Sequence, residues 1–222
     1  EGDSVWIDEE GLIFSGAVVD NGGIISGIKP INKRILFFGD SITAGLSVYS
    51  PAEVQPMSHG ASVNYAAVCT QKLNAIDIRV AFGCTGIVHV GPASTPNAFG
   101  YLDYMTETRE ETGEFPDLIV INYGTNDATE DQTEEFVIGY PAFLDKLADK
   151  YNGVPVFAVI PFNQARAQEI KSAVEVRPNV FLVDTESWNY TGAVHPNAID
   201  SKWLGENLAD EILYILGEEF FA

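Results

Sequence analysis

The chain has 222 residues, 46% of them hydrophobic, which suits one globular domain with a full core. Its formal net charge is −20 at pH 7, from acidic residues scattered along the sequence. This charge repels phosphate backbones and anionic lipid, so it disfavours a nucleic-acid partner. No apolar run approaches the roughly 18 residues that a membrane span needs, so we expect no membrane insertion. Neutral small-molecule or saccharide substrates fit such a surface best.

The cysteines and the start of the chain give weaker information. The two cysteines, Cys69 and Cys84, form neither a disulfide framework nor a metal-ligand pattern, and the three histidines lack ligand spacing. We therefore predict no metal site. The chain begins at Glu1 without an initiator methionine or a signal peptide, which we interpret as a processed or excised form. With the acidity, this start slightly favours secretion.

Residues 1–30 differ from the rest of the chain. They hold short β-like pieces, at residues 5–7, 12–14, 17–19 and 24–25, separated by glycine turns. The region is too short to form a sandwich by itself. We therefore predict a β-rich N-terminal extension at 1–30, a small β element or the remnant of a β-sandwich domain, followed by a main domain at 31–222.

From residue 34 onward, short apolar runs alternate with helical patterns. The apolar runs predict five strands, at residues 35–38, 78–82, 118–122, 156–160 and 180–183. The helical patterns lie at about 61–74, 132–150, 163–176 and 197–217. Strand–helix alternation is typical of right-handed βαβ units. We predict a three-layer α/β/α flavodoxin-like sandwich whose five-stranded parallel sheet has the order 2-1-3-4-5.

Chemically distinctive residues follow four of the predicted strands. They are Gly39-Asp40-Ser41, Gly83-Cys84-Thr85-Gly86, Gly124-Thr125-Asn126-Asp127 and, before the last helix, His195-Pro196-Asn197. A serine can attack a carbonyl carbon, and a histidine with a pKa near 6.5 can take and return its proton. Glycine-loop N–H groups and an asparagine amide can stabilise an oxyanion, as can the N-terminus of a helix beginning at the serine. The pattern therefore indicates acyl transfer.

These blocks, in this order, resemble the SGNH (GDSL-type) esterase/lipase superfamily over roughly residues 34–218. The resemblance implies Ser41 as the nucleophile and His195 as the general base, with no cofactor. It implies oxyanion donors from the Ser41 N–H, the Asn126 side chain and a glycine N–H of the second block. We assign that glycine to Gly86, with Gly83 as the alternative.

The histidine block departs from the family pattern. Members usually carry an aspartate three residues before the histidine, and here that position is Gly192. A backbone carbonyl could orient the imidazole in a Ser–His dyad, or a nearby acid, Asp184 or Glu186, could replace the aspartate, or the enzyme could be crippled. Loss of an orienting aspartate costs about 10⁴-fold in a triad that depends on it. We place the dyad first.

A narrower resemblance concerns the substrate. A β-rich stretch before Lys33-Arg34-Ile35, then Gly39-Asp40-Ser41-Ile42-Thr43, is similar to carbohydrate acetyl esterases of family two. This resemblance implies deacetylation of acetylated saccharides, although a fold does not fix a substrate. The alternatives are a lipase or thioesterase for longer acyl chains, and a non-catalytic carbohydrate-binding protein on a degenerate hydrolase scaffold.

Several further residues have two interpretations each. Asp40 either takes part in binding and chemistry or braces its turn. Trp188 and Tyr190 either stack on a sugar ring or anchor their loop by core packing. We expect His59 to lie in a solvent-exposed loop. The long loop at about 87–117 is expected to form one wall of the substrate cleft.

Overall fold

Five parallel strands form the central layer of the computed structural model, which describes residues 6–7, 15–27, 31–50, 56–104, 106–108, 110, 115–191 and 194–222. The strands are β1 (Arg34–Gly39), β2 (Ile76–Ala81), β3 (Leu118–Asn122), β4 (Val156–Val159) and β5 (Val180–Val183). Their order, β2-β1-β3-β4-β5, and their parallel pairing confirm the predicted topology. Because β1 lies between β2 and β3, the loops after these three strands open at one edge of the sheet.

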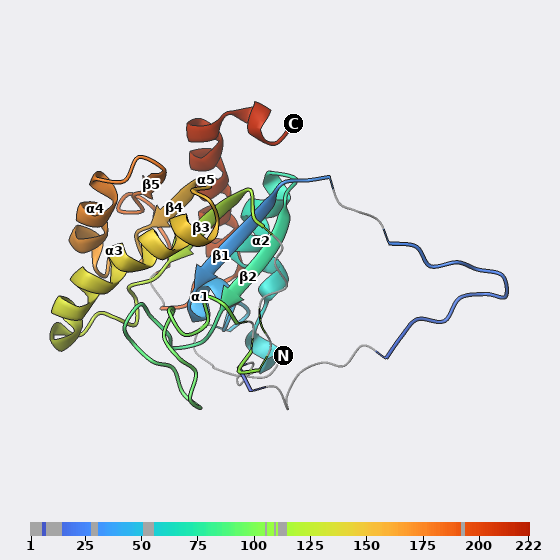
Figure 1. The fold of residues 1–222 in the computed structure, drawn as a ribbon, viewed down its shortest axis with the longest axis horizontal. Helices are drawn as coiled ribbons and strands as arrows, with labels where there is room; N and C mark the ends of the chain where they lie inside the picture. Colours follow the sequence, from blue (N-terminus) through green and yellow to red (C-terminus); the bar gives the residue numbers. More distant parts are fainter. Residues whose placement is uncertain are drawn as a thin grey trace.

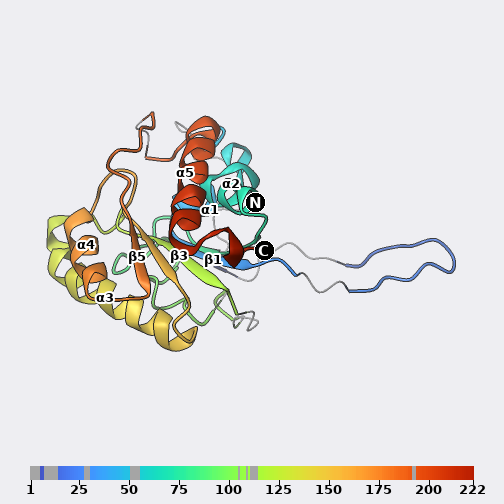
Figure 2. The ribbon, with the colours of Figure 1, turned by 90° about the horizontal axis from the view of Figure 1, so that it is seen from above.

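Helices cover both faces of the sheet, as predicted. They are α1 (Ser41–Ala44), α2 (Tyr65–Lys72), α3 (Thr133–Lys150), α4 (Ala167–Glu175) and α5 (Ala198–Leu216). Short 3-10 turns lie at Pro56–Ser58, Ala61–Val63, Glu130–Gln132 and Glu218–Phe220. Figures 1 and 2 show α2 and α5 on one face and α3 and α4 on the other. Within the described chain, no helix combines the length and apolarity that crossing a bilayer demands.

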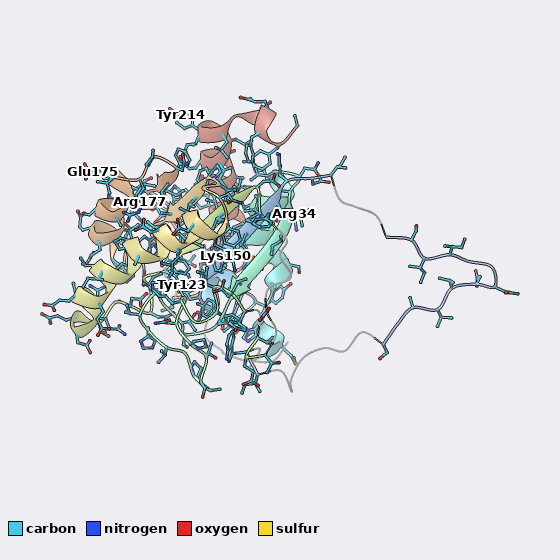
Figure 3. All side chains as sticks on the ribbon, viewed as in Figure 1. Arg34, Tyr123, Lys150, Glu175, Arg177 and Tyr214 are labelled. Atoms are coloured by element: carbon cyan, nitrogen blue, oxygen red, sulfur yellow. The ribbon has the colours of Figure 1, made fainter. Side chains whose placement is uncertain are left out.

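The alternation of side chains along β1 explains the two-sided core. Ile35 and Phe37 pack into the cluster that contains residues of α2 and α5, whereas Leu36 and Phe38 pack into the cluster that contains residues of α3 and α4. Successive side chains of a strand point to opposite faces, so a strand buried on both sides reads as a continuous apolar run. Figure 3 shows Tyr123, which follows β3, inside the molecule and Tyr214 on the outer side of α5.

The N-terminal region forms no strand among its described residues. Trp6 is buried against the main domain, with its ring centroid 5.3 Å from that of Phe82. Residues 15–27 extend away from the body as an arm (Figures 1 and 2) that turns at Asp20, whose carbonyl accepts from the Gly23 N–H. The predicted piece at 12–14 lies outside the described residues. The domain boundary at residue 30 stays a prediction.

Candidate active site

Ser41 begins α1, just beyond the carboxyl end of β1, the second strand of the sheet. Figure 1 shows α1 at this end of β1. Asp40 caps this helix, because its Oδ1 accepts from the Ile42 N–H at 2.9 Å. The helix spans only four residues and ends at Gly45, whose φ of 89° is left-handed. Such a short helix has a small macrodipole. The expected charge stabilisation by a helix N-terminus is therefore weak, and individual N–H groups must supply it.

His195 comes from the loop before α5 and meets the serine. Its Nε2 lies 2.9 Å from Ser41 Oγ, although the two residues are 154 positions apart in sequence. The Ser41 side chain is largely buried and the His195 ring is partly buried. Burial, and then the charge of nearby His59, lower the pKa of His195 below its usual value of 6.5. The ring is therefore neutral near pH 7 and is able to accept the serine proton.

The two acids considered as partners of the histidine lie elsewhere. Asp184 Oδ2 is 2.8 Å from Lys171 Nζ, and this hydrogen bond lowers the pKa of Asp184. Glu186 is exposed, and its N–H donates to Asp184 Oδ1 at 3.1 Å. Within the described ranges, neither acid forms a hydrogen bond with His195. Gly192 lies outside those ranges.

Asn126 connects the loops that follow the first two strands. Its Nδ2 donates to the Thr85 carbonyl oxygen at 2.8 Å and lies 3.3 Å from Asp40 Oδ2. Asp40 in turn holds the N–H next to the nucleophile. The structure therefore links the Asn126 amide to the Ser41 turn through one carboxylate.

Asp127 braces the glycine loop. Its carboxylate accepts from three backbone N–H groups at 2.9–3.0 Å, those of Ile87, Val88 and His89. A Cβ at Gly86 would come within 2.3 Å of Asp127 Oδ1, so only glycine fits there. The close approach of the Asp127 carboxylate explains why residue 86 is a glycine.

The N–H groups of the glycine loop differ in whether they are already hydrogen-bonded. The Gly86 N–H donates to the His89 carbonyl oxygen at 2.9 Å and is therefore already engaged. Over the described ranges, the N–H groups of Gly83 and Cys84 make no hydrogen bond. Cys84 has an exposed side chain and a left-handed φ of 56°. The geometry favours Gly83 or Cys84 over Gly86 as a donor to a ligand.

Asp40 is buried and braces the turn that carries Ser41. It is 1% exposed, and burial raises its pKa to about 7. The hydrogen bond from the Ile42 N–H opposes this increase, and the charge of Asp127 adds a smaller one. With so little exposed surface, the carboxylate fits the brace better than the binding interpretation. Its part in substrate binding stays a prediction.

The aromatic residues before the histidine loop also pack inward. The rings of Trp188 and Tyr190 lie 6.5 and 6.2 Å from that of Phe162, and both side chains are partly buried. Of their two interpretations, the contacts fit loop anchoring. In the long loop, Tyr101 is fully buried and its hydroxyl lies 2.7 Å from that of Tyr123, so this residue fills the core instead of lining a cleft.

Two residues near the histidine have surroundings that the sequence did not predict. His59 is 9% exposed, not solvated as expected, and its Nδ1 accepts from the Ser47 N–H at 3.0 Å. Asp200 is buried in the first turn of α5 and accepts from Thr191. An acid in a first helical turn is so common that nothing in the sequence signals the contact between Asp200 and Thr191.

The combined geometry brings together, on a doubly wound α/β sheet, the kinds of groups that a serine hydrolase uses. A hydroxyl lies at the carboxyl end of a central parallel strand, an imidazole lies in contact with it, and a carboxamide and backbone N–H groups belong to the adjacent loops. Among the described residues, no cluster of three histidine, cysteine or acidic side chains is arranged to hold a metal ion.

The model of the GDSL-like Lipase/Acylhydrolase family matches residues 37–199 of this chain. The chain belongs to this family. Membership places it among carboxylic ester hydrolases. The match includes the serine, asparagine and histidine blocks on which the resemblance was based.

One curated relative is similar in sequence and several solved structures are similar in fold. The cellulase/esterase CelE of Acetivibrio thermocellus is 27% identical over 158 residues, which are 66% of this chain and 19% of the length of CelE. The fold is similar to that of a family two carbohydrate esterase from Clostridium thermocellum in complex with cellohexaose, with a TM-score of 0.74, 22% identity, and coverage of 87% of this chain and 67% of that chain. An acetyl xylan esterase from Butyrivibrio proteoclasticus has a TM-score of 0.73, 18% identity, and the same two coverages.

Proposed function

We propose that this chain is a serine esterase that removes small O-acyl groups, most importantly acetyl, from carbohydrates. The single observation that carries the proposal is the 2.9 Å contact between Ser41 Oγ and His195 Nε2. Family membership supports the ester hydrolysis. The saccharide substrate is supported by relatives described as carbohydrate and acetyl xylan esterases, and by a net charge of −20, which favours neutral substrates.

The reaction follows from the positions of the two side chains. Ser41 Oγ attacks the ester carbonyl carbon while His195 Nε2 takes the hydroxyl proton, and the carbonyl π electrons move to the oxygen. Collapse of this intermediate breaks the bond to the sugar oxygen, which receives the proton from His195. Water then attacks the acyl-serine with His195 again as the base, which releases the acid and restores Ser41.

The negative oxygen of the intermediate needs donors that are already in place. We assign this role to the Ser41 N–H, the Asn126 amide and the N–H of Gly83 or Cys84, in place of Gly86. The Asn126 amide points at Thr85 and Asp40 in the free protein, so binding of the oxyanion competes with its 3.3 Å contact to Asp40.

We further propose that the enzyme works as a Ser–His dyad. The pKa of His195 is lowered by burial and by His59, whereas a bonded carboxylate would raise it. Asp184 is occupied by Lys171. Asp184→Asn and Glu186→Gln should therefore retain near-full turnover of a chromogenic acetate ester. Turnover as low as that of His195→Ala in either variant contradicts the dyad.

Acyl-chain length tests the substrate class. We expect p-nitrophenyl acetate to be hydrolysed with a higher kcat/KM than the octanoate ester, and acetylated xylan or cello-oligosaccharides to release acetate. A preference for octanoate would favour the lipase or thioesterase alternative. A fluorophosphonate probe should label the wild type and not Ser41→Ala, and absence of labelling in both would favour a non-catalytic binding protein.

A further inference from the structure

A buried carboxylate joins the two ends of the loop that carries His195. Asp200, in the first turn of α5, is 6% exposed. It accepts from the Thr191 N–H at 3.2 Å and from the Thr191 hydroxyl in a second, shorter bond. These two bonds join residues nine positions apart, on either side of His195 in the sequence.

Asn197 completes the connection. Its Oδ1 accepts from the N–H groups of Ile199 and Asp200 at 2.8 and 2.9 Å, and its Nδ2 donates to Thr191 Oγ1 at 3.1 Å. The Thr191 hydroxyl therefore donates to Asp200 and accepts from Asn197. Thr191, Asn197 and Asp200 form a closed polar ring, which we name the loop clasp.

The residue after the histidine is fixed from the same helix. Pro196 is buried, its ring restricts its own φ, and its carbonyl oxygen accepts from Ser201 Oγ at 3.4 Å. The backbone is therefore held on both sides of His195 by groups of α5.

We propose that Asp200 is a positioning residue for the general base, holding the His195 loop through Thr191 in place of an acid bonded to the imidazole. This inference rests on the proposed function, because it assigns the base role to His195. A base must lie in hydrogen-bond reach of the nucleophile, and a displacement of about 1 Å can cost about 100-fold in rate. Two bonds to one buried carboxylate remove much of the freedom that would allow such a displacement.

A purely local role for Asp200 makes a different prediction. An acid in a first helical turn stabilises the helix through the helix dipole, whatever Thr191 does. Changes at Thr191 leave that effect intact while opening the clasp. The Thr191 variants therefore separate positioning from stabilisation of α5.

The test compares Thr191→Val, which removes the hydroxyl, with Thr191→Ser, which keeps it, and adds Asp200→Asn. Asp184→Asn is the matched control, a neighbouring acid paired with Lys171. On p-nitrophenyl acetate we expect Thr191→Val and Asp200→Asn to lower kcat by about 10-fold with KM nearly unchanged, below the limit of about 100-fold given above. Thr191→Ser and Asp184→Asn should match the wild type. The double variant Thr191→Val/Asp200→Asn should have a kcat no lower than that of the slower single variant, because both changes open the same clasp.

The titration of the His195 ring, followed by NMR and assigned with His195→Ala, gives a readout independent of turnover. In the wild type the midpoint should lie below 6.5, and in Thr191→Val it should rise as the ring gains solvent. Unchanged kcat and unchanged titration in Thr191→Val overturn the clasp, even where Asp200→Asn fails to fold. A wild type that hydrolyses no ester, with a titration that still moves in Thr191→Val, defeats the proposed function and leaves the clasp standing.

Discussion

The nucleophile half and the histidine half of the candidate active site are held by different means. Ser41 lies two residues beyond the end of a strand whose side chains are buried on both faces, and the intervening Asp40 is 1% exposed. No larger residue fits at Gly39, the last residue of the strand, because a Cβ there would come within 2.0 Å of Thr43 Oγ1. His195 instead lies on a loop whose adjacent Val194 is 60% exposed.

The difference separates two kinds of dependence. The position of Ser41 is tied to the packing of the sheet, so changes near it should alter stability together with activity. The position of His195 depends on a few local hydrogen bonds, so changes there should alter activity with little loss of global stability. The following predictions test that contrast.

The largest effect should come from the two reacting side chains. Ser41→Ala and His195→Ala should each lower kcat by at least about 10⁴-fold, because either change removes the proton-transfer pair. Burst-free steady-state kinetics on p-nitrophenyl acetate measure this loss, and thermal unfolding should show both variants folded. A His195→Ala variant within 10-fold of the wild type would remove histidine as the base.

Much of the fold was predictable because its signals are local. The run from Ile35 to Phe38 is apolar at every position, which is typical of a strand buried on both faces, and it became β1. Strand–helix alternation then fixed the parallel sheet and its order. The start of α2 was less accurate, because residues 61–63 form a separate 3-10 turn and Asn64 caps the helix on the Ala67 N–H.

The site was predictable in its members but not in their detailed contacts. The order of the blocks placed Ser41 and His195 at the same edge of the sheet, and the structure brings them into contact. The engagement of the Gly86 N–H depends on how the loop folds back to His89, which no spacing rule gives. The bracing of that loop by Asp127 joins residues about 40 positions apart, so it is visible only in three dimensions.

On the nucleophile side, Asp40→Asn should change how stability depends on pH. The pKa of Asp40 rises from 3.8 unfolded to about 7 folded, so the folded state binds the proton more tightly between these values. The contribution of Asp40 to the free energy of unfolding therefore falls as pH rises from about 4 to 7. The loss is roughly 4 kcal/mol, at about 1.4 kcal/mol per pKa unit. The asparagine variant keeps an acceptor for the Ile42 N–H and should lack this loss.

Urea unfolding at pH 4.5 and pH 7.5 measures the difference between variant and wild type. Asp184→Asn is the control that should show no change in this difference between the two pH values, because the pKa of Asp184 is lowered below 3.8 in the folded protein and its contribution is lost only in stronger acid. If Asp40→Asn follows the pH dependence of the wild type, the carboxylate is not held in the buried setting described above.

On the histidine side, His59→Gln should produce the smallest effect, a shift of the acid limb of kcat/KM. The charge of His59 is the second cause of the lowered pKa of His195, after burial, so its removal should move the midpoint upward without restoring 6.5. Activity needs neutral His195, so the variant should lose activity at a higher pH than the wild type and keep the same alkaline plateau. Glutamine retains an acceptor for the Ser47 N–H.

His89→Gln is the matched control for this shift, because His89 bonds Gln132 at 3.0 Å and does not contribute to the pKa of His195. A pH profile of kcat/KM from pH 4.5 to 8 distinguishes the two variants. We expect the midpoint of the acid limb to shift upward only in His59→Gln, with thermal stability unchanged. This result supports the contrast between the two halves, because the charge of His59 then affects the pKa of His195 without affecting stability. A large loss of thermal stability in His59→Gln would contradict the contrast, because the histidine half would then depend on buried packing as the nucleophile half does.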